Sequence, residues 1–130
     1  MAQQEIEVIL ARQLAGYLAF PIFIVDPEGT LLYYNEPAEA ILGQKFDETG
    51  AMPAAQWTTV FTATGQTGSP LPADELPLMI AVTQRRPAQG RFWIRGLDGV
   101  AHEIDVAAFP LLGVAGRFLG AVALFWEAPL

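Results

Sequence analysis

The 130-residue sequence contains no cysteine. This absence excludes disulfides, thiol nucleophiles, thiolate metal ligands, iron–sulfur clusters and every cofactor attached through sulfur. Histidine is almost as scarce, because His102 is its single copy. A metal site built from several histidines is therefore excluded as well, and we expect no metal.

Positive charge is also in short supply. The chain has 7 Lys and Arg against 14 Asp and Glu, a formal net charge of −7. Because phosphate backbones and anionic lipids repel an acidic chain, we expect neither nucleic acid nor a membrane surface as a partner. Charged residues make up 16% and hydrophobic residues 52%. This balance allows a sizeable core, and the length predicts one domain.

Long hydrophobic runs are missing too. The longest apolar run, residues 118–126, has nine residues, whereas a membrane-spanning helix needs about 20. Gln3, Gln4, Glu5 and Glu7 occupy the place where a signal peptide has basic residues. We therefore expect a cytoplasmic protein.

The first half of the chain shows clear helix and turn signals. Residues 3–18 predict an amphipathic helix, because apolar residues recur at three- and four-residue steps. Residues 21–34 predict a hairpin that turns at 26–29. A second helix is expected over 36–42, capped by Asn35 and ended by Gly43. Residues 44–72 give no assignment, although their large apolar residues must be buried somewhere.

The second half is mostly β. A helix is expected over 74–84, with Pro77 tolerated in its first turn. Alternating residues then predict strands on either side of the Asp98-Gly99 turn, and residues 118–126 predict the last strand. Runs of strands and helices in this order predict an α+β fold, with one antiparallel sheet and helices packed on one face.

Two of the expected strands, 22–25 and 118–126, are apolar on both sides. In an antiparallel sheet this pattern means that something covers both faces. Helix 3–18 covers part of one face, and a second copy of the chain is the simplest cover for the rest. The alternative is that the helix folds back and covers everything. The homodimer interface is expected to contain Ile6, Ile9, Leu10, Leu14, Ile22, Ile24, Leu119 and Phe125.

Residues 22–43 resemble the opening of a PAS domain. They combine an apolar strand, an Asp26-x-x-Gly29 turn, a strand followed by Asn35, and a short helix closed by Gly43. The Asp98-Gly99 turn, the end of the fourth strand at Pro110 and residues 116–126 are similar to the end of the same pattern. The resemblance implies a PAS-like domain over 19–127, preceded by a dimerisation helix over 1–18.

The resemblance implies a five-stranded sheet in the order 2-1-5-4-3 that cups a small ligand cavity under the helices. Its helix over 74–84 would close the cavity with Leu76, Met79 and Ile80. The strands would line it with Phe23, Val25, Phe92, Ile94, Ile104, Val106, Ala108, Val122 and Leu124.

The same resemblance bears on cofactors. Flavin-photoreceptor members of the family use a cysteine beside the flavin ring, and this chain has none. The positions where those members place polar flavin-binding side chains are Ile94, Ile104 and Val122. Haem-binding members usually place their ligand on the helical side, whereas His102 lies on a strand. We therefore expect no cofactor.

The expected function is that of a non-catalytic sensory and signal-transduction domain. It would bind a small apolar ligand or act as a dimerisation and protein-interaction module, with an effector that the sequence does not identify. One alternative is a small isomerase-like enzyme on an apolar substrate, which needs a buried acid or base such as His102. Another is a ligand-free assembly domain, which would have a solid core in place of a cavity.

Overall fold

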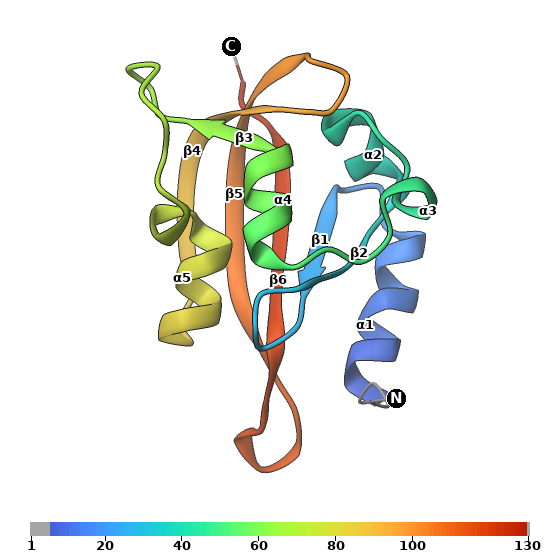
Figure 1. Cartoon of the computed structure of the whole chain (residues 1–130). Helices are drawn as coiled ribbons and strands as arrows, with labels where there is room; N and C mark the ends of the chain where they lie inside the picture. The colour runs from blue at the N-terminus through green and yellow to red at the C-terminus, as the bar shows by residue number, and fades with distance from the viewer. Residues whose placement is uncertain (1–5, 130) are drawn as a thin grey trace.

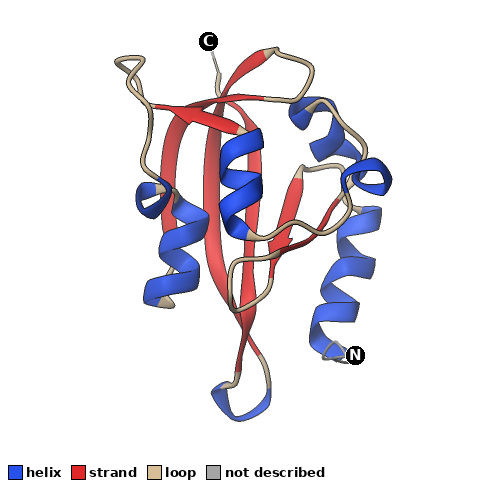
Figure 2. Cartoon of the chain, viewed as in Figure 1, coloured by secondary structure: helices blue, strands red, loops and turns tan. Residues whose placement is uncertain are grey.

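The computed structural model describes residues 6–129 as an antiparallel sheet with helices packed against it (Figures 1 and 2). No helix in this described part is long and apolar enough to cross a membrane. In chain order the elements are α1 (Ile6–Tyr17), β1 (Ile22–Val25), β2 (Leu31–Tyr34), α2 (Glu36–Leu42), α3 (Phe46–Thr49), α4 (Ala54–Val60), β3 (Thr62–Thr64), η1 (Ala73–Glu75), α5 (Pro77–Gln84), β4 (Ala88–Arg95), β5 (Ala101–Leu112), η2 (Val114–Gly116) and β6 (Phe118–Glu127).

The sheet has six strands in the order β2-β1-β6-β5-β4-β3. The predicted α+β class and the predicted order of five strands are confirmed. The sixth strand, β3, adds an edge through the pairing of Thr62 with Arg95 and of Thr64 with Trp93. Its three residues lie in the stretch that gave no assignment, and they are too few to show a period.

Helices cover both faces of the central strands. Figure 1 shows α4 and α5 lying across the sheet, and the main core forms between the sheet and α2, α4 and α5. On the other face, Ile22, Ile24 and Val122 pack with Ala15 of α1. Both faces of β1 are therefore covered within one chain, as in the alternative where the N-terminal helix folds back.

Asn35 connects three elements and is the one buried polar residue of the described part, at 1% exposure. Its Oδ1 accepts from the amides of Ala38 (3.3 Å) and Ile22 (2.9 Å). Its Nδ2 donates to the carbonyls of Ala15 (2.9 Å) and Phe20 (2.8 Å). The predicted cap of α2 is thus confirmed, and the same side chain also holds the end of α1 and the start of β1.

Two predicted element limits are wrong, and both involve proline. The helix expected over 74–84 is broken at Leu76, which is extended (ψ 134°) because the following proline disfavours helical backbone there. Pro110 does not end its strand. It pairs with Ala121, and β5 continues to Leu112. This is tolerated because β4 stops opposite Ala108, so Pro110 has an open side where no ladder amide is needed.

Small residues decide where α5 sits. Ala88, Ala108 and Ala123 are paired side by side across β4, β5 and β6, and α5 packs over this part of the sheet with the buried Ala81. Larger inward side chains begin beyond the N-terminal end of α5. The helix and these larger side chains leave a space between them, which the next section describes.

The backbone of Gly120 makes a strong stability prediction. Its φ is +133°, and a Cβ there would overlap the carbonyl oxygen of Val25. We expect Gly120→Ala to lower the free energy of unfolding by about 3 kcal/mol or more. Gly50→Ala is the control, because Gly50 also has a positive φ (+65°) but open space around it. Its expected loss is about 1–2 kcal/mol. Equal losses in urea unfolding would contradict the overlap.

Candidate functional site

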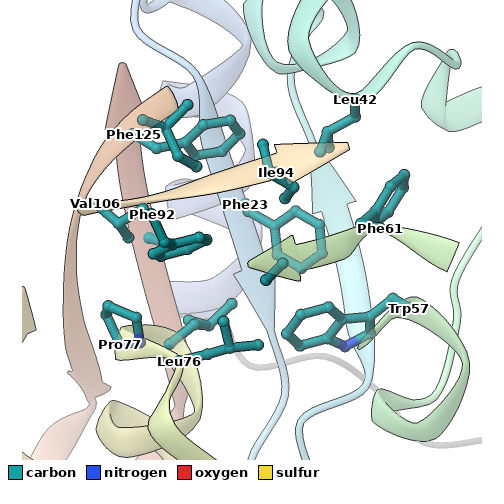
Figure 3. Close-up of a pocket in the computed structure, with 14 residues that line it drawn as sticks. Phe23, Leu42, Trp57, Phe61, Leu76, Pro77, Phe92, Ile94, Val106 and Phe125 are labelled. Carbon is teal, nitrogen blue, oxygen red and sulfur yellow. The ribbon is translucent and has the colours of Figure 1, made fainter. Parts of the chain in front are cut away.

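A cavity of about 60 Å³ lies between the sheet and the helices (Figure 3). The sheet contributes side chains from β1, β3, β4, β5 and β6, while α2, α4 and the start of α5 supply the rest. The lining consists of Phe23, Leu42, Trp57, Phe61, Ala63, Leu76, Pro77, Leu78, Phe92, Ile94, Ile104, Val106, Ala123 and Phe125.

The lining is apolar throughout. Its one polar side-chain atom, Nε1 of Trp57, already donates to the carbonyl of Gly29 at 2.8 Å. In the described part of the chain no buried side-chain nitrogen or oxygen lacks a hydrogen-bond partner. The side chains of the cavity therefore offer no free donor or acceptor, and a ligand would be selected mainly by shape and apolarity.

Aromatic rings form one side of the cavity. The ring of Phe23 lies 5.0 Å from that of Trp57 and 6.4 Å from that of Phe61, both edge to face. Behind it Phe23 stacks on Tyr34, with centroids 5.9 Å apart. The Tyr34 hydroxyl donates to the carbonyl of Gln44 at 2.8 Å, and burial raises its pKa. Tyr34 is therefore a neutral hydrogen-bond donor at neutral pH.

The structure brings six of the predicted cavity residues together. These are Phe23, Leu76, Phe92, Ile94, Ile104 and Val106. Val25 and Ala108 are buried in the main core but lie outside the lining. Met79 and Ile80 are half-buried on α5 and do not line the cavity either. The helix turns Leu76, Pro77 and Leu78 toward it in their place.

The predicted orientation of the last strand is wrong. Ala123 and Phe125 of β6 line the cavity, whereas Val122 and Leu124 pack on the α1 side of the sheet. Ala123 is paired with Ala108, and paired residues share a face of the sheet. Because β6 is apolar on both faces, the sequence shows no alternation, and a shift of one residue exchanges the two sides.

Sequence reasoning missed three lining residues, Trp57, Phe61 and Ala63, because all lie in the unassigned stretch. The available signal was the presence of a tryptophan and a phenylalanine among polar residues and glycines. It indicates burial but not the partner surface. Leu42, Pro77 and Leu78 were missed for a similar reason, since their direction depends on how the helices dock.

The comparisons with known proteins agree on the architecture. No family model and no curated protein match the sequence. Solved structures do match. The PAS domain of a protein from Colwellia psychrerythraea is 16% identical, with a TM-score of 0.65 over 93% of this chain and 96% of that chain. The PAS domain of nitrogen regulation protein NR(II) from Vibrio parahaemolyticus is 14% identical, with a TM-score of 0.63 over 92% and 98%. The Rhodobacter sphaeroides LOV protein is 12% identical, with a TM-score of 0.74 over 96% and 69%.

This chain has the PAS fold. The resemblance of residues 22–43 to the opening of a PAS domain is thereby confirmed at the level of the fold.

The lining of this PAS cavity does not fit a flavin. The edge of a flavin ring carries several polar atoms, and burying polar atoms without hydrogen bonds is costly. Ile94 and Ile104 line the cavity with apolar side chains, the volume is about 60 Å³, and the chain has no cysteine.

The side of α1 that meets the sheet is made of small residues. The helix packs on the sheet through small side chains, among them Ala11 and Ala15, which allow close approach to Ile22 and Ile24. Ile22, Ile24 and Leu119 are buried within the chain, and Phe125 lines the cavity. Assigning these four residues to a dimer interface is therefore wrong. The other four predicted interface residues, Ile6, Ile9, Leu10 and Leu14, are exposed on α1.

The residues that line the cavity include no acid or base. His102 is paired with the lining residue Ile94 on the neighbouring strand, and its Nδ1 lies 3.4 Å from Oε1 of Glu127. On the outer face of the sheet Arg91 donates to both oxygens of Asp105, at 2.8 and 3.0 Å. This contact lowers the pKa of Asp105. Within residues 6–129 no group of three or more His, Asp or Glu could hold a metal ion.

The orientation of β6 can be tested by truncating two adjacent aromatic residues. Phe125 is buried against the cavity, whereas Trp126 is 38% exposed on the other face. We expect Phe125→Ala to lower the free energy of unfolding by about 3–5 kcal/mol and Trp126→Ala by about 1 kcal/mol. Guanidinium unfolding of both variants measures the difference. A larger loss for Trp126→Ala would mean that the strand has the opposite orientation.

Proposed function

We propose that this protein is a non-catalytic sensory and signal-transduction module that binds a small apolar molecule in its PAS cavity. The observation that carries the proposal is a cavity within the core whose lining side chains are aromatic and aliphatic and have no free polar atom. The PAS fold of its structural neighbours supports a sensory role. The proposed setting is the cytoplasm, and no cofactor is part of the proposal.

The two alternatives fit the cavity less well. An isomerase-like enzyme needs a proton donor or acceptor inside the cup, and the lining residues include no acid or base. A purely structural assembly domain would fill its core with side chains, but here about 60 Å³ stays unfilled beside the aromatic rings. Shape-selective binding of an apolar molecule makes use of the unfilled space and needs no acid or base in the lining.

The size of the cavity limits its ligand. An apolar cavity of about 150 Å³ stays dry and binds benzene or xenon, so about 60 Å³ favours a smaller molecule of a few heavy atoms. A polar ligand would lose its hydration without regaining hydrogen bonds. Xenon is therefore the appropriate first probe, because it is small, apolar and chemically inert.

Xenon titration tests the cavity directly. We expect saturable NMR shifts of the Ile104 and Val106 methyl groups with rising xenon pressure, because both line the cavity. Ala63→Val and Ala123→Val place added methyl groups in the same space and should each remove the response. Ala101→Val is the control, since Ala101 is exposed at the start of β5, where valine is well tolerated. Shifts that rise linearly without saturation, or that survive both cavity variants, would contradict the proposal.

We also propose that the exposed side of α1 associates with a second copy of the chain. Leu10, Leu14 and Tyr17 are 56%, 61% and 89% exposed, and Ile6 and Ile9 are exposed as well. The apolar surface continues onto the loop after β5, because Val114 is exposed there and its amide contacts Oε2 of Glu7. The residues named in this stripe are apolar apart from the tyrosine hydroxyl, and an apolar stripe of this kind is suited to pairing with an identical helix.

Measurements of the particle mass at two salt concentrations test the association with a second copy. We expect a particle of about twice 14.1 kDa, and we expect dimerisation to strengthen with salt because each copy carries a charge of −7. Leu10→Glu with Leu14→Glu should give a monomer. Leu97→Glu, at an exposed turn between β4 and β5, should leave the dimer intact. A monomeric wild type in light scattering at 100 μM would overturn the association.

A further inference from the structure

One aromatic residue at the edge of the sheet contacts side chains of both faces. The ring of Phe46, in α3, lies 5.4 Å from that of Tyr34 and 5.3 Å from that of Tyr33. Consecutive strand residues point to opposite faces, so Tyr34 is in the main core while Tyr33 packs on the α1 side. Because β2 is an edge strand, a ring just beyond it reaches both layers.

On the inner face this contact leads to the cavity. Tyr34 stacks on Phe23 (interplanar angle 4°) and lies 6.2 Å from Phe61, edge to face. Both Phe23 and Phe61 line the cavity. Protein cores are packed at the density of organic crystals, so a displaced ring displaces its neighbours. A change at Phe61 is therefore passed to Tyr34 and then to Phe46.

On the outer face the same contact leads to α1. The guanidinium carbon of Arg12 lies 4.7 Å from the centroid of Tyr33 and 5.7 Å from that of Phe46, within the range of a cation–π interaction. Ala15 lies about one turn after Arg12 in α1, and its carbonyl accepts a hydrogen bond from Nδ2 of Asn35. The C-terminal end of α1 is therefore fixed, while Arg12 connects its middle to the two rings.

We propose that the state of the cavity reaches α1 around the edge of the sheet, through the contacts of Phe46 with Tyr34, Tyr33 and Arg12. The proposal rests on the proposed function only in taking the cavity as the sensing site. The alternative route runs through the sheet itself, where Ile24 and Val122 separate the cavity layer from α1. The edge route is favoured because its rings are in continuous contact from Phe61 through Tyr34 to Phe46 and Tyr33. The helix that carries Phe46 is also joined to its neighbours, since the Phe46 amide donates to Oε2 of Glu39 at 2.9 Å, so a shift of the ring is passed on to what it contacts.

Amide hydrogen exchange tests this coupling without any ligand. The readout is the exchange rate of the α1 amides of residues 10–16, normalised to the core amides of β5, which report global opening. We expect Phe61→Leu to raise the normalised α1 rate by about threefold or more. In a Phe46→Leu background the same change should have no further effect. Arg12→Met is a second background, which removes the cation–π contacts of Arg12 with Tyr33 and Phe46. In this background too, Phe61→Leu should have no further effect on the α1 exchange rate.

Phe92→Leu is the matched control. Phe92 lines the same cavity but is not a member of the ring series, so its truncation should leave the normalised α1 rate within about twofold. Equal effects of Phe61→Leu and Phe92→Leu, or an effect of Phe61→Leu that persists in both backgrounds, would overturn the edge route.

The outcome is separable from that of the proposed function. If xenon does not bind but Phe61→Leu still acts on α1 through Phe46, the coupling stands and the ligand proposal fails. If xenon binds but α1 responds equally in the wild type and in Phe46→Leu, the coupling fails alone.

Discussion

The structure depends on covering both faces of two strands at the centre of the sheet. β1 and β6 present apolar side chains on each face, and water must be excluded from both. On one face the main core does this with α2, α4 and α5. On the other face α1 does it with small side chains such as Ala15, which lie directly on Ile22 and Ile24. The close approach turns the larger residues of α1 outward, so the exposed stripe is a consequence of the same packing.

The position of the cavity follows from side-chain size along the sheet. The row of Ala88, Ala108 and Ala123 allows α5 to lie close to the strands. Beyond the start of α5, rings from Trp57, Phe61 and other residues meet over larger strand side chains. Rigid rings fill space less completely than flexible aliphatic chains, and a small apolar space remains between them. Its lining has no free polar side-chain atom, which is why shape is the property by which a ligand would be recognised.

The connection between α1 and the rest of the fold is made at two points of different character. Asn35 makes four hydrogen bonds in a buried site, and such a fully satisfied group fixes geometry. Arg12 makes a surface contact with Tyr33, which is weaker and more easily changed. A helix that is held firmly at one end and loosely in its middle can change its position without unfolding. The coupling that we propose between the cavity and α1 acts through the second of these points.

The sequence by itself determined the elements whose signals are local. Asn35 and Gly43 mark the limits of α2 because capping depends on a few neighbouring residues, and the inward phase of Phe92, Ile104 and Val106 follows from alternation. The tertiary structure alone decided the rest. The orientation of β6 depends on its register with β5 because both of its faces are apolar. Which side of α1 meets the sheet depends on how closely small residues allow the two to approach. Local patterns carry no information about such distances, which are set only when the elements dock.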